Sequence, residues 1–146
     1  MRIYKDLVKN SNQGQRQCDE IIFIVIQDHN DDNVCHYNVT NNKVVQLIPD
    51  ENISASVSGP KINKNGIKHG VCTMYNSISI ALKDNIDTEG QKLCKKLIMT
   101  LKMRYKIKNE NILRIKDVTG VTSPLAWQNN DDWNILLKEI SDAFDY

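Results

Sequence analysis

The stretch Ile21-Ile22-Phe23-Ile24-Val25-Ile26-Gln27-Asp28 contains six consecutive apolar residues and ends in an amide and a carboxylate. A continuous run rich in Ile and Val is typical of a strand that is buried on both faces within a sheet. Residues at the carboxyl end of such a strand project toward the crevice that the following loops form. We therefore expect a core strand over 21–27 and a site to which Gln27 and Asp28 contribute.

The size and composition of the chain are those of an ordinary globular domain. Its 146 residues are 40% hydrophobic and 25% charged, with a formal net charge of +1. We expect one domain over residues 21–146, preceded by an N-terminal arm or short helix over residues 1–20. The near-neutral charge argues against binding to DNA or RNA. No apolar stretch approaches the roughly 20 residues that a membrane span requires.

The N-terminal residues and the cysteines bear on the compartment. The N-terminus lacks the apolar segment of a secretory signal, which predicts a cytoplasmic protein. The four cysteines are far apart and show no zinc-finger spacing, so we expect free thiols. They are Cys18, Cys35, Cys72 and Cys94.

Several segments after the core strand also predict strands. Residues 34–39 and 44–48 indicate a hairpin around Asn41-Asn42. Ser77–Leu82 alternates with period two, as a half-buried strand does, and Ile112-Leu113-Arg114-Ile115 indicates a short strand. Together with two helices, this order predicts an α/β fold with a mixed central sheet.

The two helices are indicated by start signals and by apolar spacing. Thr88-Glu89-Gly90-Gln91 is a capping-box pattern, and Asp131-Asp132 places acidic residues in the first turn of the last helix. Apolar stripes at helical spacing follow each start. The stripes are Leu93, Leu97, Ile98 and Leu101 in the first helix, and Trp133, Leu136, Leu137, Ile140 and Phe144 in the second. Lys92, Lys95, Lys96 and Lys102 lie off the first stripe and are expected to face solvent.

Residues 50–75 form the least regular part of the chain. Glycines interrupt this stretch, and it carries Lys61, Lys64 and Lys68. A loop of this length in a compact domain is commonly functional or mobile. We expect its lysines to contact a phosphate-bearing ligand, helped by backbone amides near the glycines.

Four segments, in this order, resemble the type 2 N-acetylmuramoyl-L-alanine amidases, the fold shared with peptidoglycan recognition proteins and many phage endolysins. The segments are Phe23–Ile26, the hairpin from His36 to Asp50, the strand from Asn76 to Ile80, and the run from Arg114 to Pro124. The resemblance implies a mixed central sheet flanked by helices. The first helix of that family, between the first strand and the hairpin, is missing here, since only residues 29–33 bridge the two.

The chemistry of that family is not matched. The resemblance implies one zinc ion held by two His and a Cys or Asp, at positions that correspond here to Gln27, Ile115 and Ser123. An amide, an aliphatic side chain and a hydroxyl do not bind zinc usefully. We therefore expect no metal, no cofactor and no amidase activity. The alternative is a relocated site that uses His36 with Asp28 or Asp117.

The vacated pocket is expected to hold a ligand. Its candidate residues are Gln27, Asp28, Cys35, His36, Asp117 and Ser123, with Trp127 beside the groove and Lys61, Lys64 and Lys68 in the loop. A structural reading stays open for three of them: His36 as a core histidine, Asp117 as a turn cap and Trp127 as a core residue.

The resulting hypothesis is a catalytically inactive amidase-fold protein that sequesters a small molecule. One specific form is a phage-encoded sponge for a nucleotide immune signal of the host. The alternatives are a non-catalytic binder of muropeptide fragments, a hydrolase with a relocated Asp/His site, and a purely structural role. A homo-oligomer is also compatible with the sequence.

Overall fold

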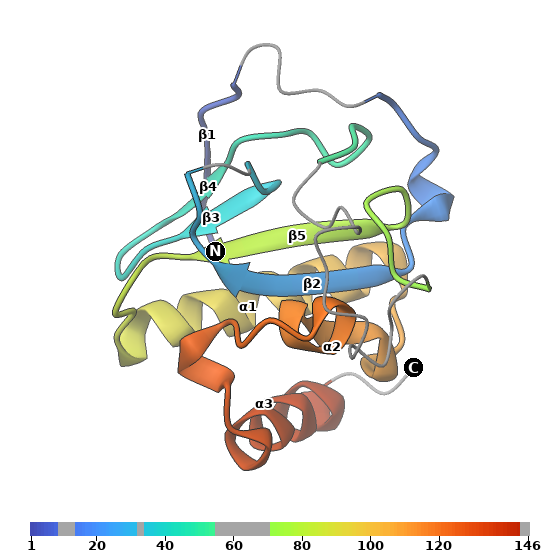
Figure 1. Ribbon diagram of the computed structural model, residues 1–146. Coiled ribbons are helices and arrows are strands. Elements are labelled where there is room, and N and C mark those ends of the chain that lie inside the picture. The colour runs from blue at the N-terminus through green and yellow to red at the C-terminus, as the bar shows by residue number, and fades with distance from the viewer. Residues whose placement is uncertain (9–13, 32–33, 55–70, 144–146) are drawn as a thin grey trace.

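The computed structural model describes residues 1–8, 14–31, 34–54 and 71–143. They form a six-stranded sheet flanked by helices (Figure 1). The strands are β1 (Ile3–Lys5), β2 (Phe23–Asp28), β3 (Tyr37–Val39), β4 (Val44–Gln46), β5 (Ser77–Leu82) and β6 (Ile112–Arg114). The α-helices are α1 (Thr88–Tyr105), α2 (Ile115–Thr119) and α3 (Asn130–Ala143). Short 3₁₀ helices are η1 (Cys18–Glu20), η3 (Asn109–Asn111) and η4 (Leu125–Trp127).

The sheet confirms the α/β fold class. Its strand order is β1-β4-β3-β5-β2-β6. Strands β3 and β4 form the expected antiparallel hairpin, whereas every other neighbouring pair is parallel. Strand β2 lies between β5 and β6, with Ile24 opposite Ile78 and Ile112. A strand held between two parallel neighbours is buried on both faces, which explains its continuous apolar sequence.

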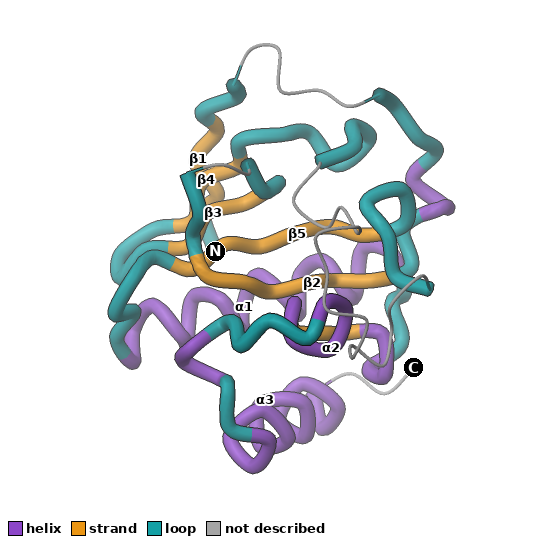
Figure 2. The backbone as a smooth tube through the Cα atoms, in the orientation of Figure 1, coloured by secondary structure: helices purple, strands orange, loops and turns teal. Residues whose placement is uncertain are grey.

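The two faces of the sheet carry separate apolar clusters. Figure 2 shows the helices beside the strands of the sheet. Side chains alternate along a strand, so Ile24 and Ile26 point to one face of β2, and Phe23 and Val25 point to the other. The first face packs on α1 and α3 and forms the main core. The second, to which Leu113 of β6 contributes, packs on α2 in a smaller cluster that includes Ile115.

Helix α1 confirms the expected stripe but differs from the sequence prediction at two points. Its N-cap is Asp87 rather than Thr88, because the Asp87 carboxylate accepts a 2.9 Å hydrogen bond from the Gly90 N–H. Lys102, expected to face solvent, is completely buried. It lies four residues after the buried Ile98, and this spacing places both on the same face of a helix.

The ends of the chain also differ in detail from the expectation. Residues Ile3–Lys5 form the outermost strand of the sheet rather than a helix. Helix α3 buries Trp133, Leu136 and Ile140 as expected, whereas Phe144 lies outside the described residues. None of the described residues between β2 and β3 is helical. This agrees with the expectation that the first helix of the resembled family is missing there. None of the helices in the described part of the chain is long and apolar enough to cross a membrane.

Candidate functional site

The carboxyl end of β2 holds the first two candidate residues, but on opposite faces. Gln27 is buried and lies opposite Ala81 of β5, on the face that carries Phe23 and Val25. Asp28 is half-buried and lines a cavity on the other face. The alternation of side chains along the strand therefore separates the two residues.

Asp28 and Ser123 are brought together, although 95 positions separate them in the sequence. The Asp28 N–H donates a 2.9 Å hydrogen bond to the Ser123 hydroxyl, whose oxygen lies 3.3 Å from the Asp28 carboxylate. The same carboxylate accepts a 3.0 Å bond from the Leu125 N–H. These contacts attach the loop after α2 to the end of β2. The Ser123 hydroxyl is thus engaged in holding this loop.

The resemblance implies that Gln27, Ile115 and Ser123 stand at zinc-ligand positions, and the chemistry of these side chains does not fit a metal ion. Ile115 begins α2 and packs in the apolar cluster with Val25, Leu113 and Val118. An aliphatic side chain has no lone pair to donate, and the amide of Gln27 and the hydroxyl of Ser123 are poor ligands for zinc. In the described ranges, no group of three or more His, Cys, Asp and Glu residues is arranged to hold a metal.

His36 is completely buried and lies in a hydrogen-bonded position. The Ser79 N–H donates to its Nδ1 at 3.2 Å, so the ring proton lies on Nε2 and is donated to the Asn52 carbonyl at 2.7 Å. Burial lowers the pKa of His36 to about 4. The nearby guanidinium of Arg16, 3.3 Å from Nε2, acts in the same direction. The imidazole is therefore neutral at physiological pH and serves the structure, one of the two roles left open by the sequence.

Asp117 is held by Arg114 in a second polar cluster. The Arg114 backbone N–H donates to Oδ2 at 3.0 Å, and its guanidinium donates to Oδ2 at 3.2 Å and to Oδ1 at 3.0 Å. The guanidinium also donates to the Trp127 carbonyl at 3.1 Å and to the Asn130 side chain at 2.9 Å. Arg114 thus connects α2, η4 and the start of α3, and Asp117 supports it.

Trp127 is 5% exposed and belongs to the main core. Its ring centroid lies 6.1 Å from that of Trp133, with an interplanar angle of 59°. This tilted contact is typical of paired aromatic residues in a core. The core role that the sequence left open is therefore observed.

The remaining candidates are distributed as follows. Lys61, Lys64 and Lys68 lie outside the described residues. All four cysteines are thiols, and Cys18 is exposed while Cys35, Cys72 and Cys94 are buried. The described candidate residues thus belong to four different places: the Asp28–Ser123 contact, the His36 position with the adjacent Cys35, the Arg114 cluster with Asp117 and Trp127, and Gln27 on the opposite face of β2.

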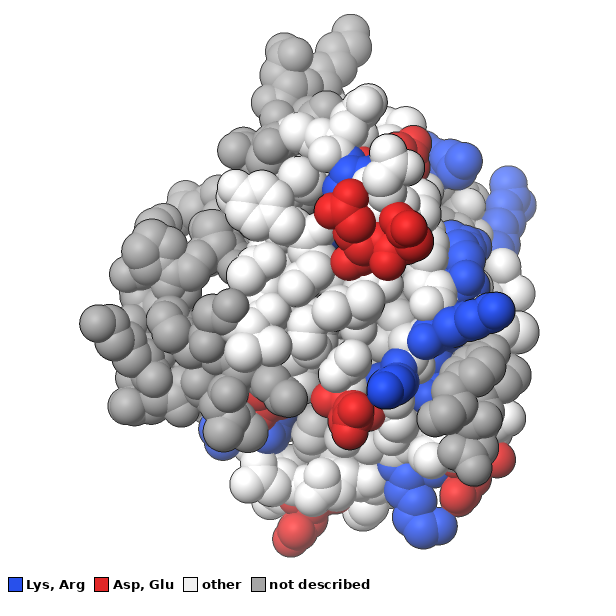
Figure 3. All heavy atoms as spheres, turned by 90° about the vertical axis from the view of Figure 1, so that its right-hand side faces the viewer, with Lys and Arg blue, Asp and Glu red and all other residues white. Residues whose placement is uncertain are grey.

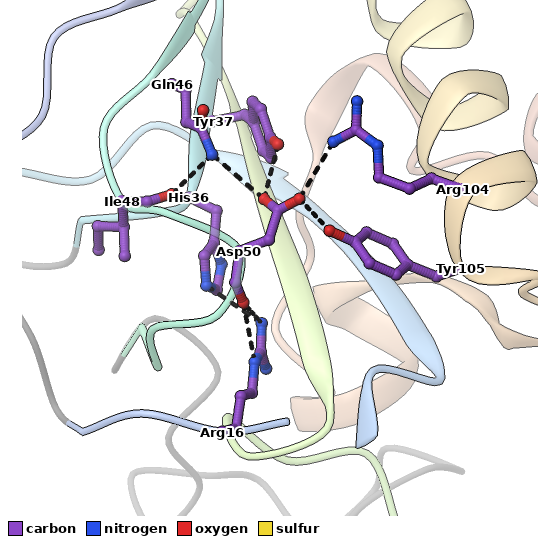
Figure 4. A network of polar contacts seen from close by, with 8 residues as sticks. All are labelled: Arg16, His36, Tyr37, Gln46, Ile48, Asp50, Arg104 and Tyr105. Carbon is purple, nitrogen blue, oxygen red and sulfur yellow. Dashed lines mark hydrogen bonds and ion pairs between the residues drawn. The ribbon is translucent and has the colours of Figure 1, made fainter. Parts of the chain in front are cut away.

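The structure also contains a buried carboxylate that the sequence did not single out as a site. Asp50 is 5% exposed and lies at the centre of a network that Figure 4 shows. Its Oδ1 accepts hydrogen bonds from the Tyr37 hydroxyl at 2.6 Å and from Gln46 at 3.3 Å. Its Oδ2 accepts from Arg104 at 3.2 Å and from the Tyr105 hydroxyl. The network joins the hairpin to the carboxyl end of α1.

Arg16 extends this network to the N-terminal segment. Its guanidinium donates to the Asp50 carbonyl from Nε at 3.1 Å and from Nη2 at 3.0 Å, and to the Ser77 carbonyl at 2.6 Å. Burial lowers the pKa of Arg16, against the attraction of Asp50. Burial and the Asp50 carboxylate raise the pKa of Tyr37. Both tyrosine and arginine therefore act here as hydrogen-bond donors. The only sequence signal for this site was the position of Asp50 at the end of the hairpin motif.

Two adjoining cavities lie on the α1 and α3 side of the sheet. The larger, of about 530 Å³, opens between α1, η4 and α3. The smaller, of about 390 Å³, includes Asp28 and shares Gln91 and Ala126 with the first. The walls of the larger cavity carry Gln91, Lys92 and Lys95 from α1, Trp127 from η4, and Asp132, Ile135 and Glu139 from α3. Lys95 and Glu139 form a 2.5 Å ion pair between the two helices.

Charged side chains are distributed over the surface in small groups. On the face drawn in Figure 3, Lys and Arg gather along one border, and Asp and Glu form smaller groups beside uncharged surface. This mixture agrees with the net charge of +1.

Comparison with known proteins identifies the fold. A scan of protein-family models and a search of curated proteins find no match. Among solved structures, a mutant of PlyL is similar, with a TM-score of 0.76 at 16% identity, over 97% of this chain and 99% of that one. A mutant endolysin from Bacillus subtilis has a TM-score of 0.73 at 16% identity, over 95% and 98%. The N-acetylmuramoyl-L-alanine amidase LysC from Clostridium intestinale URNW has a TM-score of 0.68 at 14% identity, over 97% and 98%. The chain therefore has the fold of endolysin and N-acetylmuramoyl-L-alanine amidase domains.

Proposed function

We propose that this protein is a non-catalytic form of the amidase fold that binds and sequesters a small anionic molecule. The observation that supports the proposal is the set of side chains at the three positions that the resemblance assigns to metal ligands. Gln27 is an amide, Ile115 packs in an apolar cluster, and the Ser123 hydroxyl bonds to the end of β2. These side chains do not supply the ligands that zinc-dependent hydrolysis requires.

The cavity between α1, η4 and α3 supports the binding part of the proposal. Its volume of about 530 Å³ lies within the range of small-molecule sites. Lys92 provides positive charge on one wall, and Lys95 beside it is paired with Glu139 of the facing wall. Ammonium groups bind phosphates. A nucleotide carries phosphates, so a phage-encoded sponge for a nucleotide immune signal, acting in the cytoplasm of the bacterial host, is the specific form we propose.

The first test is native mass spectrometry of the purified protein mixed with AMP, ATP and cyclic di-AMP. The expected result is a nucleotide adduct without zinc. We then expect the variant Lys92→Gln/Lys95→Gln to bind the same nucleotide at least about tenfold more weakly, since charge-assisted contacts are lost. Lys43→Gln/Lys108→Gln removes two exposed charges away from the cavity and serves as the matched control.

A zinc ion in the purified protein, together with cleavage of a soluble muropeptide, would overturn the proposal. Binding of an intact disaccharide-peptide without any nucleotide binding would favour the alternative, a muropeptide-fragment binder. A hydrolase with a relocated Asp/His site is the second alternative, from a different class. The geometry gives it little support, because His36 bonds to Ser79 and Asn52, whereas Arg114 holds Asp117.

A further inference from the structure

The outermost strand β1 presents a backbone edge. Its partner β4 lies on one side, and within the described ranges no strand pairs with the other side. The Asp6 N–H donates to the Gln46 carbonyl at 2.9 Å, and the Val8 N–H donates to the Leu47 carbonyl at 3.0 Å. Since backbone groups alternate along a strand, the N–H and C=O groups of the odd-numbered residues point outward. Ile3, Lys5 and Leu7 therefore present unpaired groups at this edge.

The opposite edge of the sheet is different. Strand β6 is buried at all three of its residues, and α2 follows it directly. Around β1, by contrast, apolar side chains are exposed: Tyr4 at 44%, Leu7 at 49% and Val8 at 41%. An edge with open backbone groups and exposed apolar side chains favours pairing with another strand. The β1 edge meets this description, and the β6 edge does not.

We propose that β1 is the interface of a symmetric dimer, in which the β1 strands of two copies pair antiparallel around a two-fold axis at Tyr4. The occupant of the edge is thus a second copy of this chain. In this arrangement residue numbers of paired positions add up to eight. Ile3 of each copy lies opposite Lys5 of the other, and their outward N–H and C=O groups form the hydrogen-bonded pairs of an antiparallel ladder. A two-fold interface of this kind is closed, so it produces dimers rather than fibres.

Charge complementarity selects this register among the alternatives. With the axis at Tyr4, Arg2 of each copy lies opposite Asp6 of the other, which gives two pairs of opposite charge. With the axis at Lys5, two lysines lie directly opposite each other. With the axis at Asp6, two carboxylates do so. Like charges that face each other across a ladder are destabilising, and opposite charges are stabilising.

The side chain of Tyr4 is placed for the central contact. Within one copy the Arg2 guanidinium lies 4.6 Å from the centroid of the Tyr4 ring. In the dimer the two Tyr4 rings meet across the axis at a non-hydrogen-bonded pair, where side chains approach most closely. Each ring is then flanked by an Arg2–Asp6 pair. The pairing uses only short strands, so we expect association that depends on concentration rather than an obligate dimer.

Sedimentation equilibrium over a hundredfold range of concentration, with any affinity tag at the C-terminus, tests the proposal. We expect reversible dimerisation of the full chain. Arg2→Asp or Asp6→Arg alone should weaken dimerisation at least about tenfold, because each creates two like-charge pairs. The double variant Arg2→Asp/Asp6→Arg should restore it, because the pairs are again of opposite sign. Lys108→Asp, which makes the same charge change as Arg2→Asp at an exposed site far along the chain, should leave dimerisation unchanged.

Lys5→Pro adds an independent arm. The Lys5 N–H points away from β4, so its removal leaves the pairing with β4 intact and deletes a hydrogen bond of the dimer. Circular dichroism establishes that each variant is folded. A protein that is monomeric at every concentration overturns the proposal, and so does a dimer that the double variant fails to restore. Neither result depends on ligand binding, since the cavity and β1 have no residue in common.

Discussion

The Asp50 network and the carboxyl end of β2 are both polar, yet only the first buries a charge among ionisable partners. At Asp50, two tyrosines, a glutamine and an arginine donate to one carboxylate. At the end of β2, the buried Gln27 is neutral, and Ser123 contributes a neutral hydroxyl. A buried charge is costly unless it is paired, whereas a neutral group needs only a hydrogen bond. The comparison predicts that the fold depends more on the first region than on the second.

Asp50→Asn tests the first half of this comparison and has the largest expected effect. The substitution keeps the shape of the side chain but removes the charge and replaces an acceptor by a donor. We expect the free energy of unfolding to fall by about 2–4 kcal/mol, since four donors lose a charged acceptor. Urea denaturation measures the change. Asp84→Asn, at an exposed site, is the matched control and should change stability by less than about 0.5 kcal/mol. Equal losses of stability in Asp50→Asn and Asp84→Asn would show that the buried charge of Asp50 is no more important to the fold than an exposed carboxylate.

The pH dependence of the free energy of unfolding tests the burial of His36, which lies beside the Asp50 network. Its pKa is about 4 in the folded protein, against 6.5 ordinarily. Below pH 6.5 the unfolded chain binds a proton that the folded protein does not bind. The free energy of unfolding therefore falls as the pH drops from 6.5 to about 4, by at most about 3 kcal/mol, and this contribution levels off below that.

The variant His36→Gln isolates this contribution, because carboxylates titrate in both proteins. The free energy of unfolding of the wild type, relative to that of His36→Gln, should fall as the pH drops from 6.5 to about 4. Urea denaturation at a series of pH values measures it. Parallel curves for the two proteins would mean that folding does not lower the pKa of His36.

Ser123→Ala tests the second region and has the smallest expected effect. The substitution removes the acceptor of the Asp28 N–H, at a half-buried position. We expect a loss of about 1–2 kcal/mol, since one backbone donor loses its partner. Thermal unfolding measures it, with Ser141→Ala in α3 as a control that should be near neutral. A loss as large as that of Asp50→Asn would show that the end of β2 is as important to the fold as the network.

The sequence predicted β2, β5, α1 and α3 well, because apolar runs and apolar periodicity encode them, whereas β1 and α2 were not predicted. The alternation of Ser77–Leu82 gave a strand with the observed bounds, and the spacing of Leu97, Ile98 and Leu101 gave the buried face of α1. The end of α1 was harder, since Lys102 is charged yet follows Ile98 at the spacing of the core face. The charge of Lys102 indicated exposure, whereas its position on the helix indicated burial, and Lys102 is buried.

The candidate site was less predictable, for two physical reasons. Gln27 and Asp28 are adjacent, and the alternation of a strand already implies that they point to opposite faces. This signal was present in the sequence. The partners of Asp50, by contrast, lie up to 55 positions away. They meet only when the hairpin packs on α1, so no local sequence pattern predicts the network.

The wide spacing of the Asp50 partners has a consequence for the order of folding. Bonds from Arg104 and Tyr105 to Asp50 span 54 and 55 positions, and closing such loops is entropically costly. Local elements such as α1 and the β3–β4 hairpin form with much shorter loops. We therefore expect the network to be completed after the rate-limiting barrier, so that Asp50→Asn accelerates unfolding far more than it slows folding. The network would then form late in folding and mainly slow the unfolding of the native state. Stopped-flow folding and unfolding rates of Asp50→Asn measure this effect.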